Sequence, residues 1–200
     1  GWYTSYTPYQ PEVAQGRLEM LLNFQQLIID LTGMDIANAS LLDEATAAAE
    51  AVGLSQRLDK SSSKKVFISN NCNPQTIDLI KTRTEPFGLD LIIGDEKNEL
   101  PKIKDDIICG VLSYPGTLGD ITDPSESISQ IHKKKGKAIL VCDLLALVKL
   151  KTPAELGADI AVGSAQRFGI PMGYGGPHAA FFATKEALKR SMPGRISGAS

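Results

Sequence analysis

Short, continuously apolar runs recur along this chain, and they constrain its fold more than any other feature of the sequence. Strands that are apolar at nearly every residue are buried on both faces, which is typical of parallel sheets covered by helices on each side. We expect such strands at 65–69, 89–94, 107–112, 138–142, 159–162 and 179–182, with a shorter apolar run at 36–39.

Helical patterns alternate with these apolar runs. Ser40 and Asp43 have the spacing of a capping box at one helix start, and Asp123 is placed to cap another. The alternation of strand and helix predicts an α/β fold, with a mostly parallel seven-stranded sheet and helices on both faces. We expect the helices at 11–31, 40–51, 73–82, 124–135 and 185–190.

The composition excludes several classes of function. A net charge of −2 leaves no basic surface for nucleic acid, and no apolar run approaches the roughly 20 residues that span a bilayer. We expect no targeting segment at the start of the sequence. The three cysteines have no metal-ligand spacing, and we expect Cys142 to be buried and unreactive. With two histidines, His132 on a helix surface and His178 after a glycine-rich loop, we expect no metal site.

The first twelve residues differ in character from the rest. Pro8 and Pro11 prevent a regular helix there, so we divide the chain into an irregular arm at 1–12 and one large domain at 13–200. The arm carries Tyr6 and Tyr9, and tyrosine suits positions with one buried and one wet end. We expect the arm either to pack on a neighbouring subunit or to reach a ligand, and we expect the chain to be a fragment of a longer polypeptide.

The segment 137–182 has the features of a ligand site. Two apolar runs end in polar residues, Asp143 after the first and Ser164 after the second, and a loop rich in glycine and proline follows. In open α/β sheets, ligands bind outside the carboxyl ends of the strands. We therefore expect these groups to open onto one crevice.

Asp143 suits one kind of cofactor chemistry. A carboxylate at a strand end can stabilise the protonated nitrogen of a pyridine cofactor, and the protonated ring is an electron sink. A lysine that holds such a cofactor as a Schiff base is expected after the next strand. No lysine stands between Lys151 and Lys185, and Gln166 cannot form an imine. The sequence therefore predicts a cofactor-type scaffold without its covalent anchor.

Several segments together resemble one protein family. They are similar to the amino-terminal half of the glycine cleavage system P-protein, a glycine dehydrogenase (decarboxylating), and the similarity covers essentially the whole chain. The resemblance implies the large domain of a fold type I pyridoxal-phosphate-dependent transferase, without the small domain. The segments that carry it are 6–12, 15–16, 37–43, 143–147, 157–161, 166–169 and 175–178.

The resemblance also implies a reaction and partners. In the family, glycine condenses with pyridoxal phosphate, loses its carboxylate as carbon dioxide, and passes its aminomethyl group to the lipoyl arm of the H-protein. The Schiff-base lysine belongs to the carboxyl-terminal half or a second subunit, in a motif similar to His-Lys-Thr-Phe. On this chain Gln166 takes the lysine position, Arg167 the threonine, and Asp143 the place of the ring-nitrogen partner. The resemblance thus implies no catalytic residue in this half, and a cofactor bound mainly by the partner half.

A half of this kind is expected to pack against the catalytic half and complete its pocket. Tyr6 and Tyr9 are the candidate contacts to substrate or cofactor across that interface, with Asn38 and Ser40, at a strand end, as further candidates. Two other interpretations stay open: a purely structural half, and an independent pyridoxal-phosphate-dependent transferase whose lysine is supplied elsewhere. The family implies a cytoplasmic location in bacteria and the mitochondrial matrix in eukaryotes.

Overall fold

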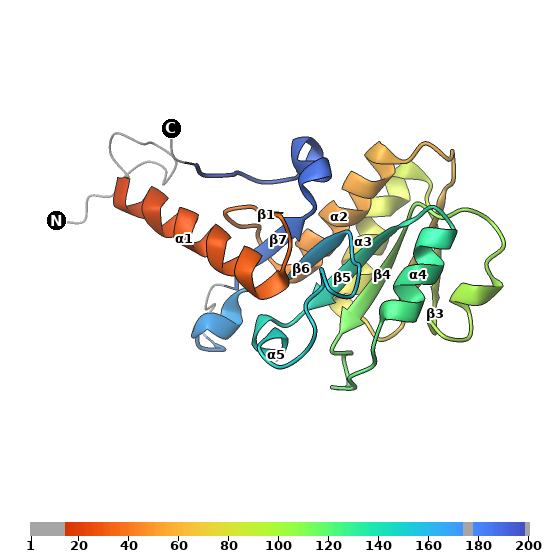
Figure 1. Cartoon of the computed structure of the whole chain (residues 1–200). Helices are drawn as coiled ribbons and strands as arrows, with labels where there is room; N and C mark the ends of the chain where they lie inside the picture. Colours follow the sequence, from red (N-terminus) through yellow and green to blue (C-terminus); the bar gives the residue numbers. More distant parts are fainter. Residues whose placement is uncertain (1–14, 174–177, 199–200) are drawn as a thin grey trace.

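The computed structural model describes residues 15–173 and 178–198, which form one seven-stranded sheet with helices on both faces (Figure 1). The predicted α/β class is confirmed. The strands lie in the order β1-β7-β6-β5-β4-β2-β3. Their bounds are β1 Ile36–Ala37, β2 Lys65–Ser69, β3 Asp90–Gly94, β4 Cys109–Tyr114, β5 Lys137–Cys142, β6 Ile160–Ser164 and β7 Ala180–Thr184.

The sheet is parallel from β3 through β2, β4 and β5 to β6. β7 runs antiparallel to β6, with Ser164 opposite Ala180, and β1 runs antiparallel to β7. Because two successive antiparallel pairings restore the direction, β1 points the same way as β6. The chain therefore leaves β1, β4, β5 and β6 at the same edge of the sheet, here called the carboxyl edge.

Helices cover each face because successive residues of a strand point to opposite sides. In β2, Phe67 belongs to one core, and Val66 and Ile68 belong to the other. α2 and α3 pack on the Val66 face, whereas α1, α4 and α5 pack on the Phe67 face. No helix in the described ranges is long and apolar enough to cross a membrane. The helices are α1 Gln15–Thr32, α2 Glu44–Leu58, α3 Pro74–Thr84, α4 Ser125–Lys133 and α5 Leu144–Leu147.

The start of α2 differs from the predicted capping box. Backbone pairing with β7 continues past Ser40, since the N–H of Leu41 donates to the carbonyl of Ala180 at 2.9 Å. The helix consequently begins only at Glu44, and Asp43 is its N-cap, with its carboxylate accepting from the N–H of Thr46 at 2.7 Å. This places the amino-terminal end of α2 at the carboxyl edge of the sheet.

The start of α4 is also shifted from its predicted position. Pro124 is the N-cap of this helix, and Asp123, the predicted cap, stands one residue further out. Its carboxylate still accepts from the backbone N–H of Ser125 at 2.9 Å. The segment expected to be a helix at 185–190 instead forms a 3-10 turn, Glu186–Ser191.

A buried carboxylate, Asp159, fastens several elements at the opposite, amino-terminal edge of the sheet. It accepts hydrogen bonds from the backbone N–H of Ala138 at 2.9 Å and from Nζ of Lys185 at 2.7 Å, and Nε2 of His132 lies 2.8 Å from Oδ2. His132 lies exposed on the surface of α4, as predicted, but it is paired with Asp159 rather than only solvated. Burial would raise the pKa of Asp159, but the hydrogen bonds from Lys185, Ala138 and His132 outweigh it and hold the pKa below its ordinary value.

This arrangement predicts an acid-sensitive fold. Because the folded-state pKa of Asp159 is lowered, its contribution to stability is present above the pKa of the unfolded chain and is lost as the pH falls through the folded-state value. At neutral pH, Asp159→Asn should lower the free energy of unfolding by roughly 1–3 kcal/mol, the usual effect of losing hydrogen bonds to a buried charge. Denaturant unfolding at neutral and acidic pH measures both effects. Asp78→Asn, at an exposed carboxyl, is the control, and an equal loss there would contradict the prediction.

Candidate functional site

A hollow of about 320 Å³, here called the strand-end hollow, opens at the carboxyl edge where β4, β5 and β6 end. The turn after β4 closes one side, and Thr117 Oγ1 donates to Asn73 Oδ1 at 2.8 Å. The structure thus brings Asp143 and Ser164 together in one crevice, as the sequence predicts. Its polar side chains are Glu44 and Asn73 from the starts of α2 and α3, Ser113, Asp143 and Ser164 from the strand ends, and Thr117 and Arg167.

Asp143 already has a cationic partner within this hollow. Nε of Arg167 lies 3.1 Å from Oδ2 and 3.3 Å from Oδ1 of Asp143. The same carboxylate caps α5 by accepting from the backbone N–H of Leu145 at 2.8 Å. Both contacts fix the carboxylate at the end of β5, and the guanidinium stands against it.

Glu44 is the second acid of the hollow. As the first residue of α2, it accepts a hydrogen bond from Nδ2 of Asn73 at 2.9 Å. Burial raises the pKa of Glu44, and the nearby Asp143 raises it further. Asn73, Thr76 and the backbone amide of Ser164 favour the charged form but do not cancel the burial effect. The sequence placed this acid at a helix start without identifying it as a site residue.

A second hollow of about 480 Å³, here called the helix-start hollow, shares Glu44, Asn73 and Ser164 with the first. Gln166 and His178 line it, so both sequence candidates lie at the site. The hydroxyl of Ser164 accepts from the N–H of Gln166 at 3.1 Å as the chain leaves β6. The side chain at the predicted lysine position is therefore a neutral amide at the rim of the crevice.

The remaining sequence candidates lie elsewhere. Asn38 is fully buried, with Nδ2 donating to the carbonyl of Pro193 at 3.2 Å and Oδ1 accepting from the N–H of Phe182 at 3.1 Å. Neither Asn38 nor Ser40 lines the two hollows, and their substrate contacts stay predictions. Tyr6 and Tyr9 lie outside the described residues.

The cysteines contribute no reactive group in the described structure. Cys142 lines the strand-end hollow but is buried, as predicted, and burial raises the pKa of its thiol. Burial also raises the pKa of Cys72, to about 12. Among residues 15–173 and 178–198, no group of histidines, cysteines and acids is arranged to hold a metal ion.

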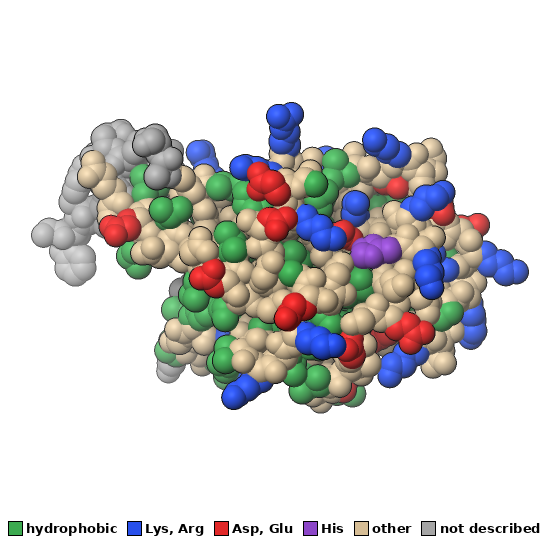
Figure 2. Space-filling model, viewed as in Figure 1, with side chains coloured by type: hydrophobic (Ala, Val, Ile, Leu, Met, Phe, Trp, Pro, Cys, Tyr) green, Lys and Arg blue, Asp and Glu red, His purple; other side chains and the backbone are tan. Residues whose placement is uncertain are grey.

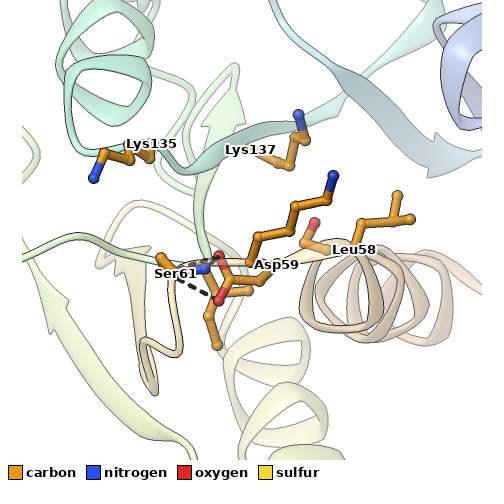
Figure 3. Close-up of a pocket in the computed structure, with 8 residues that line it drawn as sticks. Leu58, Asp59, Ser61, Lys135 and Lys137 are labelled. Atoms are coloured by element: carbon orange, nitrogen blue, oxygen red, sulfur yellow. Dashed lines mark hydrogen bonds between the residues drawn. The ribbon is translucent and has the colours of Figure 1, made fainter.

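A third hollow, of about 390 Å³, opens at the amino-terminal edge, away from these groups (Figure 3). Ser61 Oγ donates to Asp59 Oδ1 there at 2.8 Å. Figure 3 shows the amines of Lys135 and Lys137 pointing away from Asp59 and Ser61. Its charges do not converge on one ligand position, so the pair of hollows at the carboxyl edge is the candidate site.

The described residues do not fit pyridoxal phosphate as a covalently held cofactor. An imine would need an amine at position 166, where an amide stands. The carboxylate suited to a ring nitrogen is paired with Arg167, and the helix start suited to a phosphate carries Asp43 and Glu44. No step of a cofactor reaction is therefore assigned to these side chains.

Known sequences that are similar to this chain belong to one family. A family model described as "Glycine cleavage system P-protein" matches residues 1–200. The glycine dehydrogenase (decarboxylating) of Pelagibacter ubique is 80% identical over 200 residues, and that of a Bradyrhizobium species is 57% identical over 199 residues. Both alignments cover 100% of this chain but 21% of the relative. The chain thus spans about a fifth of the length of the curated relatives it matches.

Solved structures extend the comparison to the fold. A crystal structure of glycine decarboxylase (P-protein) in inhibitor-bound form matches with a TM-score of 0.88 and 39% identity, covering 96% of this chain and 44% of that one. Cystathionine gamma-lyase from Lactobacillus plantarum matches with a TM-score of 0.70 and 18% identity, covering 94% and 49%. At that identity the likeness shows the fold alone, and it confirms the predicted fold type I architecture.

The buried position of Glu44 predicts a pH-dependent effect on stability. Because its folded-state pKa is raised, the stability associated with this carboxyl is greatest at low pH and falls as the pH rises from the unfolded-state to the folded-state value. Glu44→Gln keeps an acceptor for Asn73 without the buried charge, so it should raise the melting temperature at neutral pH by a small amount that shrinks in acid. Thermal unfolding at both pH values measures this. Glu85→Gln, at an exposed carboxyl, is the control, and a pH-independent or negative effect of Glu44→Gln would contradict the prediction.

Proposed function

The chain belongs to the glycine cleavage system P-protein family, and from this we propose that it is part of a glycine dehydrogenase (decarboxylating). The whole enzyme would release the carboxylate of glycine as carbon dioxide and pass the aminomethyl group to the lipoyl arm of the H-protein. Pyridoxal phosphate would supply the electron sink for this chemistry.

Within that enzyme, this segment supports the catalytic half. The observation that carries this role is the amide of Gln166 just after β6, where an imine would need an amine, together with the pairing of Asp143 with Arg167. A half without an amine at that position cannot anchor the cofactor as an imine. We therefore assign the cofactor mainly to the carboxyl-terminal half or second subunit, which lies outside this chain.

Exposed apolar side chains at the carboxyl edge favour packing against such a partner. They come from the three segments that follow β4, β5 and β6, and are here called the apolar rim. Two of them are almost fully exposed, Leu118 at 91% and Met172 at 92%. Figure 2 shows hydrophobic side chains gathered at the lower left, where Figure 1 draws the blue turn that follows β6, next to α5. The rim consists of Leu118, Ile121, Leu145, Val148, Phe168, Ile170 and Met172.

The apolar rim is the surface that we propose to pack against the catalytic half. Exposed apolar side chains gathered on neighbouring segments are typical of an interaction surface. A partner seated on it would also reach the strand-end hollow, because Leu118 and Phe168 directly follow Thr117 and Arg167, which line that hollow. The tyrosine-bearing arm at 1–12 is the other segment that we propose to reach the partner, through Tyr6 and Tyr9.

Charges introduced into the apolar rim should disrupt the enzyme. With the two halves expressed as separate polypeptides, Leu145→Asp or Met172→Asp should weaken their association by about tenfold or more, since an unpaired carboxylate buried at an interface costs more than 1.4 kcal/mol. Co-purification and glycine turnover measure the effect. The matched control is Phe87→Asp, because Phe87 is also exposed but follows α3 at the amino-terminal edge. Equal effects at all three positions would contradict the assignment of this surface.

The tyrosine contacts have their own test. Replacing Tyr6 and Tyr9 by phenylalanine in the full enzyme removes two hydroxyls with little change in side-chain volume. If the hydroxyls contact substrate or cofactor, glycine turnover should fall by about tenfold, the effect of losing one or two hydrogen bonds of ordinary strength. Unchanged steady-state kinetics would end this proposal and favour a purely structural half.

A further inference from the structure

We propose that Glu44 and Arg167 occupy the positions of the two charged ends of a phosphorylated pyridine cofactor, and that they thereby prevent this half from binding it. The carboxylate of Glu44 takes the place of the phosphate, and the guanidinium of Arg167 takes the place of the protonated ring nitrogen. The missing lysine is then one of three obstacles to cofactor binding here. This inference concerns ligand exclusion and does not depend on the proposed turnover of glycine.

The position of Glu44 supports the first part. A helix start attracts phosphate because its free N–H groups and the helix dipole favour negative charge. Glu44 is the first residue of α2, and it also bonds Asn73, the N-cap residue of α3. The side chain of Asn73 makes no cap hydrogen bond of its own to α3. The carboxylate of Glu44 thus lies between two helix starts, where a phosphate would otherwise be favoured.

The position of Arg167 supports the second part. A pyridine cofactor needs an unpaired carboxylate aimed at its ring nitrogen. Asp143 is the carboxylate at the end of β5, and Nε of Arg167 lies 3.1 Å from it. Since Asp143 also caps α5, its orientation is fixed, and a ring nitrogen would have to displace the guanidinium.

The two charges belong to one arrangement. Glu44, Asp143 and Arg167 all line the strand-end hollow, and Asp143 and Glu44 are close enough to influence each other. Stability alone does not account for an acid at position 44, because burial disfavours its charged form and a glutamine could accept the same hydrogen bond from Asn73. A negative charge at that point has a clear effect on a ligand, however, since it repels phosphate.

The test restores the lysine with and without the two charges. It uses the full-length protein in three forms: Gln166→Lys alone, Gln166→Lys with Glu44→Ala and Arg167→Thr, and Gln166→Lys with Glu50→Ala and Arg83→Thr. The third is the matched control, because Glu50 and Arg83 form an ion pair on the outer surface of α2 and α3. Each protein is incubated with pyridoxal phosphate and reduced with borohydride, and peptide mass spectrometry quantifies pyridoxyl-lysine at position 166.

We expect at least tenfold more label at position 166 when Glu44 and Arg167 are replaced than in the other two proteins. The proposal would be overturned if Gln166→Lys alone were labelled as strongly as the variant that also carries Glu44→Ala and Arg167→Thr, because the two charges would then exclude nothing. Labelling of the triple variant no higher than that of the matched control would also overturn it. Label at position 166 is read independently of activity, so this result and the proposed enzymatic role can fail separately.

A second measurement applies even if the triple variant does not fold. Glu44→Ala alone removes the carboxylate that lies between the two helix starts, so inorganic phosphate should raise its melting temperature beyond the rise seen in the wild-type protein, at equal ionic strength with chloride. Glu50→Ala, which removes the same charge from the outer surface, should behave as the wild type does. An identical response to phosphate in all three proteins would refute the role of Glu44.

Discussion

The close parallel pairing of β5 and β6 is the constraint on which the site depends. Val141 pairs with Val162, and the strands remain so close beyond this pair that a Cβ at Gly163 would lie 2.2 Å from the carbonyl oxygen of Cys142. Only glycine fits such an approach of backbone to backbone. Asp143 and Ser164 follow directly, so the strand pairing brings the two polar ends into one crevice. β7 runs antiparallel to β6 and begins at the carboxyl edge, where its first residue, Ala180, pairs with Leu41. This pairing brings the start of α2, at Glu44, next to the end of β6.

Much of this fold follows from sequence pattern, because buried parallel strands need continuous apolar runs. The run 138–142 and the polar residue after it were sufficient to predict β5 and to place Asp143 at its end. The absence of lysine between Lys151 and Lys185 likewise predicts, from the sequence alone, that this half has no Schiff-base lysine. These features are local, because each can be read from a short stretch of sequence without knowing its tertiary contacts.

Other features depend on contacts between distant segments and could not be predicted in the same way. The sequence predicts too early a start for α2, because the pairing of Leu41 with Ala180 overrides the local capping signal of Ser40. The contact of His132 with Asp159 joins residues 27 apart in sequence. Glu44 and Asn73 likewise meet only because α2 and α3 begin side by side at the carboxyl edge. In each case the sequence pattern identifies the residue but does not show which distant residue it contacts.

The two edges of the sheet differ in role: the amino-terminal edge holds structural contacts, and the carboxyl edge holds the candidate site. At the amino-terminal edge, Asp159 links α4, β5 and the end of β7 through Ala138, His132 and Lys185. None of those residues lines the hollows at the carboxyl edge. Substitutions around the hollows at the carboxyl edge can therefore change its ligand chemistry while the contacts of Asp159 keep the architecture intact. A chain altered in this way would remain a rigid platform, useful for its shape alone.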